Sequence, residues 1–330
     1  MVILREWLLD YLVCPKTHRP LKLISVQQKE GDCILEGLLG SNNYKRAYRI
    51  VRGVPRFVES HYATGFGLQW NIHESTQIDN ERTKHSTQRF WGETGFDEKA
   101  LANQVVLDAG CGAGRFTDVV SRAKGRVIGV DLSEAVDAAY RTLGARENVA
   151  IVQASIFELP FLPGTFDYVY TIGVIQHTPD PLRALRCIAS MGKPDGGQVG
   201  VSWYKKYWYT YLHQKYWLRP IFRNWDERKL YEFVEWYAPY MLKISRALSL
   251  IPGFSKLADR ILPVANRDSI PGLSEEDKLK WAVLDTFDWY NPTYDKPQKW
   301  KDVIAVMEEY GYRTERAPLQ RTGLHCVRSA

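Results

Sequence analysis

Apolar runs and helical segments alternate from Val105 to about Ser202, and this alternation constrains the fold more than any other feature of the chain. The apolar runs are Val105–Leu107, Val127–Val130, Ala150–Val152, Tyr168–Ile172 and Val199–Val201. The segments with helical character between them are Arg115–Ala123, Ser133–Leu143 and Pro181–Met191. Strands joined by helices imply crossover connections, which place the strands side by side and parallel. We therefore predict a doubly wound α/β domain.

The 330 residues divide into four regions. Residues 1–60 contain short strand-like runs separated by glycines, and residues 61–202 contain the α/β pattern with a helical cover in front of it. Residues 203–296 are rich in Trp, Tyr, Lys and Arg and are predicted to be a mainly helical insertion. Residues 297–330 return to a helix and two short strands, which we expect to complete the sheet.

Composition and charge limit the class and the location of the protein. Hydrophobic residues make up 45% and charged residues 25%, which is typical of a folded globular chain. The net charge of +6 is compatible with an anionic substrate, a nucleic acid or an acidic membrane surface, and requires none of them. Five widely spaced cysteines favour a reducing compartment, and no apolar run approaches the roughly 20 residues of a membrane span. Because the start shows no signal-peptide pattern, we expect a cytoplasmic protein.

A glycine-rich turn follows the first predicted strand. Within Val105–Gly114 the strand ends in Asp108, and glycines stand at positions 110, 112 and 114. Glycine lacks a Cβ, so this backbone can turn tightly, approach a ligand and present the amides of a helix N-terminus. The spacing departs from the G-x-G-x-x-G of dinucleotide folds, and no Gly-Lys-Ser/Thr of a phosphate-binding loop follows. The turn therefore argues against both of those sites.

A second acidic residue ends the next predicted strand. Asp131 follows Val127–Val130 and lies 23 residues after Asp108. Ligands of open α/β sheets bind at the carboxyl ends of the strands, so both acidic residues belong to the same edge. A carboxylate at this place can accept hydrogen bonds from both hydroxyls of a ribose. We predict that Asp131 does so.

Five segments of this region together resemble the class I S-adenosylmethionine-dependent methyltransferase family. They occur in family order and at family spacing: VLDAGCGAG, VIGVDLS, VQASIFELPF, FDYVYTIGVIQHTPDP and KPDGGQVGVSW. The resemblance covers Val105 to Tyr204. It implies a Rossmann-like, doubly wound, mostly parallel sheet of seven strands, S-adenosylmethionine as the cofactor, and methyl transfer as the activity.

The resemblance also implies roles for the residues that match the glycine turn and the next strand end. Gly110, Gly112 and Gly114 would approach the methionine part of the cofactor. Asp108 would support the amino group of the cofactor, through the turn or a water. Asp131 would hold the ribose.

Further contacts to the cofactor are implied outside the turn. Leu132 would lie against the adenine, and Gly173 begins the segment expected below the donor methyl group. The family usually has an acidic residue where this chain has Ser155, which can make only a weaker contact with the adenine amine, so Ile156 is expected to add a backbone contact. Gln69 belongs to a segment that folds over the cofactor in related enzymes; packing of this segment into the core is the alternative.

The catalytic candidates are His177, Tyr204, Asp288 and Tyr290. His177 is a candidate base, with a pocket wall or a helix start as alternatives, and a base is needed only if the acceptor must lose a proton. The other three residues belong to the aromatic insertion, which we expect to be a lid over the acceptor pocket. The alternatives for this insertion are contact with a membrane, stacking on nucleobases, and packing on the sheet or on a second subunit.

The N-terminal region resembles the zinc-ribbon-like module that is often fused to bacterial methyltransferases. Cys14 with its following proline and the run Tyr48–Pro55 match the two ends of that module. A structural zinc needs four ligands, typically in Cys-x-x-Cys pairs, but Thr17 stands at the partner position of Cys14, and Cys33 has no companion. We predict a metal-free structural module, for which elemental analysis of the purified protein should find no stoichiometric zinc.

The sequence leaves three functions open. The first is methylation of a small molecule, such as a sugar or a secondary metabolite. The second uses the same cofactor for a cyclisation or an elimination, which methylthioadenosine rather than S-adenosylhomocysteine among the products would support. The third is modification of RNA, against which stand the absence of a basic cluster and of the Asn/Asp-Pro-Pro-Tyr/Phe motif. We expect a monomer or homodimer that acts on a small molecule rather than on nucleic acid.

Overall fold

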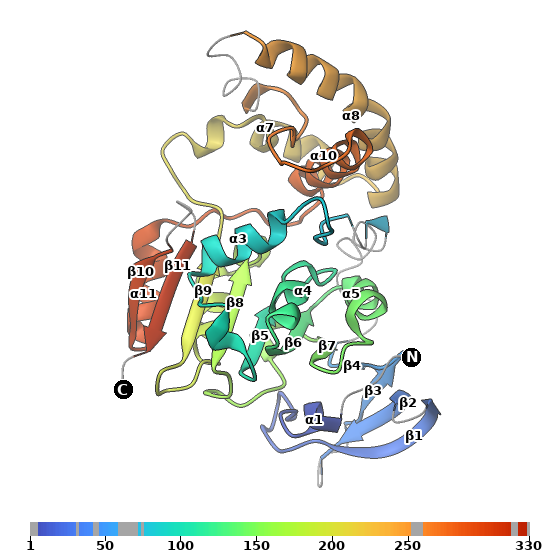
Figure 1. Ribbon diagram of the computed structural model, residues 1–330, viewed down its shortest axis with the longest axis vertical. Helices are drawn as coiled ribbons and strands as arrows, with labels where there is room; N and C mark the ends of the chain where they lie inside the picture. The colour runs from blue at the N-terminus through green and yellow to red at the C-terminus, as the bar shows by residue number, and fades with distance from the viewer. Residues whose placement is uncertain are drawn as a thin grey trace.

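The computed structural model describes residues 6–30, 33–41, 46–58, 72–73, 76–251, 260–317 and 323–328. Figure 1 shows three parts along the long axis of the molecule. A small group of N-terminal strands lies at one end, a large sheet with its helices occupies the middle, and the helices of residues 203–290 lie at the other end. The middle part carries the alternation predicted from the sequence.

The described strands form one sheet in the order β1-β2-β3-β4-β7-β6-β5-β8-β9-β11-β10. Its central strands are β5 (Val105–Ala109), β6 (Arg126–Asp131), β7 (Val149–Gln153), β8 (Tyr168–Ile172) and β9 (Gln198–Ser202). They pair in parallel, as predicted. The last two strands, β10 (Tyr312–Arg316) and β11 (Gly323–Arg328), are antiparallel to their neighbours. The sheet is therefore mixed, with a parallel centre.

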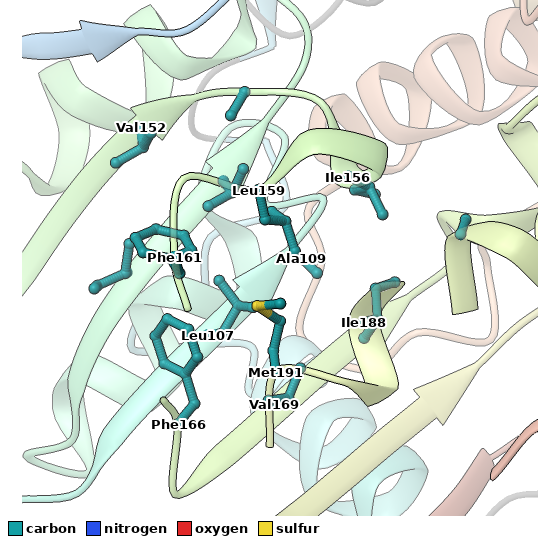
Figure 2. Close-up of a cluster of buried hydrophobic side chains, with 14 of the residues drawn as sticks. Leu107, Ala109, Val152, Ile156, Leu159, Phe161, Phe166, Val169, Ile188 and Met191 are labelled. Carbon is teal, nitrogen blue, oxygen red and sulfur yellow. The ribbon is translucent and has the colours of Figure 1, made fainter. Parts of the chain in front are cut away.

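Helices cover both faces of the sheet. They are α3 (His85–Thr94), α4 (Arg115–Arg122) and α5 (Ala135–Leu143) on one face and α6 (Pro181–Ala189) and α11 (Trp300–Glu309) on the other, with the short 3-10 helices η1 (Lys99–Leu101), η2 (Ile156–Glu158) and η3 (Ile175–His177). Successive side chains of a strand point to opposite faces, so Leu107 joins one buried cluster and Val106 the other. Figure 2 shows the first cluster, in which Phe166 and Met191 lie beside Leu107 and Val169. The sheet is doubly wound, as predicted.

The sheet of the described residues has eleven strands and not the predicted seven, because strands of the N-terminal region extend it. This region contributes α1 (Glu6–Leu9), β1 (Lys22–Glu30), β2 (Cys33–Gly40), β3 (Tyr48–Val51) and β4 (Val54–Arg56). β4 pairs in parallel with β7, and Arg56 Nη1 donates a hydrogen bond of 2.9 Å to Gln153 Oε1. Without β4, backbone N–H and C=O groups of β7 would be unpaired at a sheet edge. The described part of residues 1–60 therefore continues the sheet, and its delimitation as a module stays a prediction.

Cys14 lies in the interior of the N-terminal region. Its Sγ is 3.3 Å from the hydroxyl oxygen of Tyr48, and its backbone N–H donates a hydrogen bond of 2.9 Å to the carbonyl of Arg19. Across the ranges given above, no three His, Cys, Asp or Glu side chains are placed to share a metal ion. The metal-free state itself stays a prediction.

The insertion is mainly helical, as predicted. Its described helices are η4 (Thr210–Leu212), α7 (Gln214–Phe222), α8 (Glu227–Ser249) and α10 (Glu275–Tyr290). The last three begin after residues whose side chains accept a hydrogen bond from the first helical turn: His213, Asp226 and Ser274. Apolar side chains of α8 and α10 form a core separate from those of the sheet. None of the described helices combines the length and the apolar character that a membrane span requires.

Candidate active site

The glycine turn joins β5 to α4 at the carboxyl edge of the parallel strands. Gly110, Gly112 and Gly114 have φ angles of 95°, 51° and 89°, in a region that residues with a Cβ rarely adopt. At Gly110 a Cβ would also lie 2.4 Å from Cγ2 of Val174, in the segment after β8. The turn therefore needs glycine for its backbone conformation and, at Gly110, for the close approach of two segments.

Asp131 connects the end of β6 to the glycine turn. Its Oδ2 accepts a hydrogen bond of 2.9 Å from the backbone N–H of Gly112. Its Oδ1 accepts hydrogen bonds from the N–H of Ser133 at 2.9 Å and from the Ser133 hydroxyl at 2.7 Å. The Asp131 side chain is only partly buried. The carboxylate is thus fixed at the strand ends and still reaches the surface, which the predicted contact with a ribose requires.

Asp108 is buried behind the turn. The Thr117 hydroxyl donates a hydrogen bond of 2.6 Å to Asp108 Oδ2, which joins β5 to α4. Burial raises the pKa of the Asp108 carboxyl from 3.8 to about 7, with a contribution from the charge of Asp131, while hydrogen bonds from Thr117 and Tyr170 oppose the rise. Because the Asp108 side chain is 2% exposed, the predicted support of the cofactor amino group would pass through the turn.

The residues expected near the adenine lie at the ends of β6 and β7. Leu132 is partly exposed, and its carbonyl accepts a hydrogen bond of 3.1 Å from Gln153 Nε2. The Ser155 hydroxyl accepts the N–H of Phe157 at 3.2 Å and so caps η2. The Ile156 side chain packs in the core of the sheet. Ser155 therefore acts as a helix cap, and the Ile156 side chain points away from the surface, which leaves its backbone for the predicted contact.

The segment after β8 brings a buried amide to the same edge. Gly173 has a φ of 73°, and its N–H donates a hydrogen bond of 2.9 Å to the carbonyl of Ser202 at the end of β9. Gln176 is fully buried, and its Oε1 accepts the N–H of Tyr204 at 3.4 Å. Among the described residues its Nε2 has no hydrogen-bond partner, and a Cβ at Gly173 would lie 3.9 Å from it. A buried donor without a partner is costly, so Gln176 is a candidate ligand donor that the sequence did not reveal.

His177 lies at the junction between the sheet and the insertion. Its Nδ1 is 3.0 Å from the carbonyl oxygen of Tyr294. A carbonyl oxygen can only accept, so Nδ1 carries the hydrogen, and Nε2 is the acceptor nitrogen of the neutral ring. The ring packs edge-on against Tyr204, with a centroid distance of 5.4 Å. One nitrogen of the ring is thus held by the protein as a donor, so a role of His177 as a base would fall to Nε2.

Tyr204 lies between the sheet and the insertion. The Lys215 Nζ is 4.3 Å from the centroid of its ring, and Lys215 is paired with Asp295 at 2.8 Å. Burial raises the pKa of the Tyr204 phenol well above its usual range, and the charges of Asp288 and Asp295 add to the rise. The phenol therefore stays protonated and can donate a hydrogen bond. The structure places His177 against Tyr204, and the charge of Asp288 acts on the Tyr204 phenol.

Tyr290 is buried inside the insertion and lines no acceptor pocket, contrary to the prediction. Its side chain is fully buried, and its hydroxyl donates a hydrogen bond of 2.8 Å to Gln214 Oε1. The Phe222 ring lies against it at a centroid distance of 5.0 Å. Tyr290 shares the inner face of α10 with Phe287, and this face packs against the neighbouring helices of the insertion. Gln69 lies outside the described residues.

Arg115 connects the glycine turn to the cover and to the insertion. Its Nε donates a hydrogen bond of 2.9 Å to the Ser86 hydroxyl, and its Nη1 donates one of 3.0 Å to Gln77 Oε1. Its guanidinium carbon is 5.3 Å from the ring centroid of Trp281 in α10. In the part of the chain that the structure describes, its Nη2 is buried without a partner, and burial lowers the pKa of Arg115 from 12.5 to about 9. Arg115 still carries its charge at neutral pH, and the sequence motif did not single it out.

The protein family described as "Methyltransferase domain" matches residues 107–199, which include the glycine turn, Asp131 and the segment after β8. The chain contains an S-adenosylmethionine-dependent methyltransferase domain. Ubiquinone biosynthesis O-methyltransferase of Pseudomonas paraeruginosa is 36% identical over 110 residues, which are 32% of this chain and 47% of the relative. The enzyme of that name from Acinetobacter baumannii strain AYE is 32% identical over 135 residues, which are 38% and 56%. The chain spans about half the length of these curated relatives.

Two of the solved structures similar to this chain are named methyltransferases. A SAM-dependent methyltransferase from Aquifex aeolicus is 15% identical, with a TM-score of 0.39 over 79% of this chain and 96% of that chain. The mitomycin 7-O-methyltransferase is 15% identical, with a TM-score of 0.41 over 78% and 54%. The fold described above rests on the strand order and pairing of this chain itself.

S-adenosylmethionine is the cofactor of the methyltransferase domain, and the described residues fit it. The positive φ angles of Gly110, Gly112 and Gly114 give the tight backbone turn that a close approach to the methionine part requires. Asp131 would hold the ribose, and the unpartnered Nε2 of Gln176 is a donor for a polar group. The cofactor carries positive charge on its sulfonium and ammonium groups, which the carboxylate of Asp131 favours.

Proposed function

We propose that the protein transfers a methyl group from S-adenosylmethionine to a hydroxyl group of a small molecule, such as a sugar or a secondary metabolite. The observation that carries this proposal is the contact of His177 Nδ1 with the Tyr294 carbonyl, which makes Nδ1 a donor, so that in the neutral ring Nε2 would be the proton acceptor. A hydroxyl group must lose its proton on methylation, so a base of this kind is useful. The curated relatives are named O-methyltransferases, which supports the same type of acceptor atom.

The proposed reaction is an in-line displacement. S-adenosylmethionine supplies an electrophilic methyl group on its sulfonium sulfur. A C–O bond forms at the acceptor while the C–S bond breaks, and the products are a methyl ether and S-adenosylhomocysteine. The hydroxyl proton goes to His177 Nε2. Correct placement of the two reactants supplies much of the rate, and the protein does this by fixing the turn, Asp131 and the segment after β8.

We propose that the acceptor binds between the strand ends and the insertion. Tyr204 offers a protonated phenol there, and the nearby carboxylate of Asp288 can accept hydrogen bonds. The ion pair of Lys215 and Asp295, with side chains 10% and 2% exposed, holds α7 against the segment after α10. The position of the insertion above the carboxyl ends of β8 and β9 supports its role as a lid (Figure 1).

The acceptor class and the base are tested together. The protein is incubated with S-adenosylmethionine and panels of hydroxylated sugars, phenols and polyketides, and S-adenosylhomocysteine is measured. His177→Gln should lower kcat by about 10²–10⁴-fold and leave the Kd of the cofactor unchanged. His18→Gln, at an exposed position of the N-terminal region, is the matched control. Methylthioadenosine as the nucleoside product, or methylation of RNA only, would overturn the proposal.

The cofactor site is tested separately by binding. Asp131→Ala removes the carboxylate predicted to hold the ribose, and losing a charged hydrogen-bonding partner should weaken binding by about 1.5–3 kcal/mol, or about 10–150-fold in Kd. Calorimetry with S-adenosylmethionine and S-adenosylhomocysteine measures this change. An unchanged Kd would rule out the role of Asp131 without bearing on His177.

A further inference from the structure

Helix α8 is apolar on two opposite faces. Its inner face packs against α10 and contains the buried residues Leu230, Val234, Ala238 and Leu242. On the opposite face Trp236, Tyr240 and Ile244 follow at intervals of four residues, with exposures of 65%, 58% and 43%. Side chains four residues apart lie on one side of a helix. The second face is therefore a continuous apolar stripe that the described chain leaves uncovered.

The stripe continues onto α7 through ring contacts. Phe222 contacts Trp225 at a centroid distance of 5.2 Å, and Trp225 contacts Phe233 at 5.5 Å. Phe233 is 6.1 Å from Trp236, which is 6.2 Å from Tyr240. We call this surface the outer face; its exposed residues are Trp225, Trp236, Tyr240 and Ile244. Large exposed apolar patches of this kind mark interaction sites.

The positive charge around the outer face favours an anionic surface over a second copy of α8 as its partner. Residues 203–251 contain nine Lys and Arg and four Asp and Glu, so they account for +5 of the net charge of +6. Lys229 and Lys243 are exposed, and the helical spacing places both on the side of α8 that carries Trp236 and Tyr240. In a symmetric contact between two copies of α8, these lysines would be brought together. An anionic surface would instead pair with them.

We propose that the outer face binds the headgroup region of an anionic lipid bilayer, with α8 lying flat on the surface. Tryptophan and tyrosine are enriched at the level of lipid headgroups, because their rings are apolar and their N–H or O–H groups stay hydrated. Lysine stems extend along apolar surface while their ammonium groups reach the phosphates. A helix with this composition lies in the interface and does not span it, which agrees with the finding for the described helices.

The outer face is placed where membrane contact leaves the methyltransferase domain accessible. In Figure 1 α8 lies at the end of the molecule opposite the N-terminal strands. Strands β5, β8 and β9 and helix α4, which border the candidate site, lie between these two ends. Lipid binding is independent of the identity of the methyl acceptor, so its failure would leave the proposed function untouched.

Sedimentation with vesicles tests the proposal on the full-length protein. The wild type should bind vesicles of phosphatidylcholine with about a quarter phosphatidylglycerol, and binding to phosphatidylcholine alone should be at least tenfold weaker. The double variant Trp236→Ser/Tyr240→Ser should lose at least tenfold in partition coefficient. Lys229→Gln and Lys243→Gln should each lose about fivefold, and only with anionic vesicles.

The matched control is Ile24→Ser, which removes an exposed apolar side chain from β1 at the other end of the molecule. It should bind anionic vesicles like the wild type. Circular dichroism and S-adenosylmethionine binding confirm that each variant is folded. Two results would overturn the proposal: no binding of the wild type to anionic vesicles, or a dimer in sedimentation velocity that Trp236→Ser/Tyr240→Ser converts to a monomer while vesicle binding persists.

Discussion

The buried carboxyl of Asp108 makes a quantitative prediction about stability and pH. Its pKa is about 7 in the folded protein and 3.8 when exposed to water. The folded state therefore binds the proton more tightly than the unfolded state. The stability contributed by the protonated group is fully present below pH 3.8 and is lost as the pH rises through 7. The whole shift of about three pKa units corresponds to about 4 kcal/mol.

The variant Asp108→Asn keeps the shape of the protonated acid and removes the titration. Between pH 5 and pH 8 the wild type should lose about 2–3 kcal/mol of unfolding free energy through this group, and the variant should not. The measurement is the stability difference between variant and wild type at each pH, from urea denaturation without cofactor. The variant-minus-wild-type difference in unfolding free energy at pH 8 is then compared with the same difference at pH 5. Any effect of the amide that does not depend on pH is the same at both pH values and cancels.

The exposed position Asp195 provides the control, because Asp195→Asn also removes one carboxylate. The change in the stability difference between pH 5 and pH 8 should be close to zero for Asp195→Asn. If Asp108→Asn behaves like Asp195→Asn, the carboxyl of Asp108 is not the buried, proton-binding group described here. The reasoning would also be refuted if the wild type gained stability relative to Asp108→Asn as the pH rises from 5 to 8.

Three other variants have defined outcomes. Gly110→Ala should weaken cofactor binding at least tenfold in calorimetry, because its Cβ would lie 2.4 Å from Val174 and its φ is 95°; wild-type affinity would contradict this. Asp295→Asn breaks the buried pair with Lys215 and should lower the unfolding free energy by about 3–5 kcal/mol in denaturation. Adding Lys215→Met should recover part of this loss, and no loss for Asp295→Asn alone would show that the pair is dispensable. Tyr290→Phe should lower the unfolding free energy by about 1 kcal/mol and leave kcat unchanged. A large fall in kcat would show that Tyr290 does belong to the acceptor site.

The parallel centre of the sheet could be predicted because its signals are local. Each strand is a short apolar run, and each helix between them has its own periodicity, so Val105–Leu107 was recognised as part of β5 without knowledge of any contact. The pairing of β4 with β7 has no local signal. It depends on Arg56 meeting Gln153, which are 97 positions apart in the chain. The extension of the sheet to eleven strands was therefore missed.

In the candidate site, too, features with a local sequence signal were predicted and features that depend on long-range packing were not. Asp131 was predicted from its place after a strand, and the structure holds its carboxylate against the glycine turn. Tyr290 was assigned to the pocket because its residue type suits one, but the direction of its side chain follows from the packing of α10, which its sequence alone does not fix. Gln176 and Arg115 are notable for a donor left without a partner among the described residues, a property that exists only in three dimensions.

Because β4 pairs with β7, the edge strands of the eleven-stranded sheet are β1 and β10. β1 is irregular, with register shifts after Leu23, Val26 and Gln28, and β10 presents the charged residues Arg313 and Glu315 to solvent. Irregular and charged margins are poor templates for another strand. The sheet should therefore not recruit a further chain at either end, and self-assembly of this protein by strand addition is disfavoured by its own architecture.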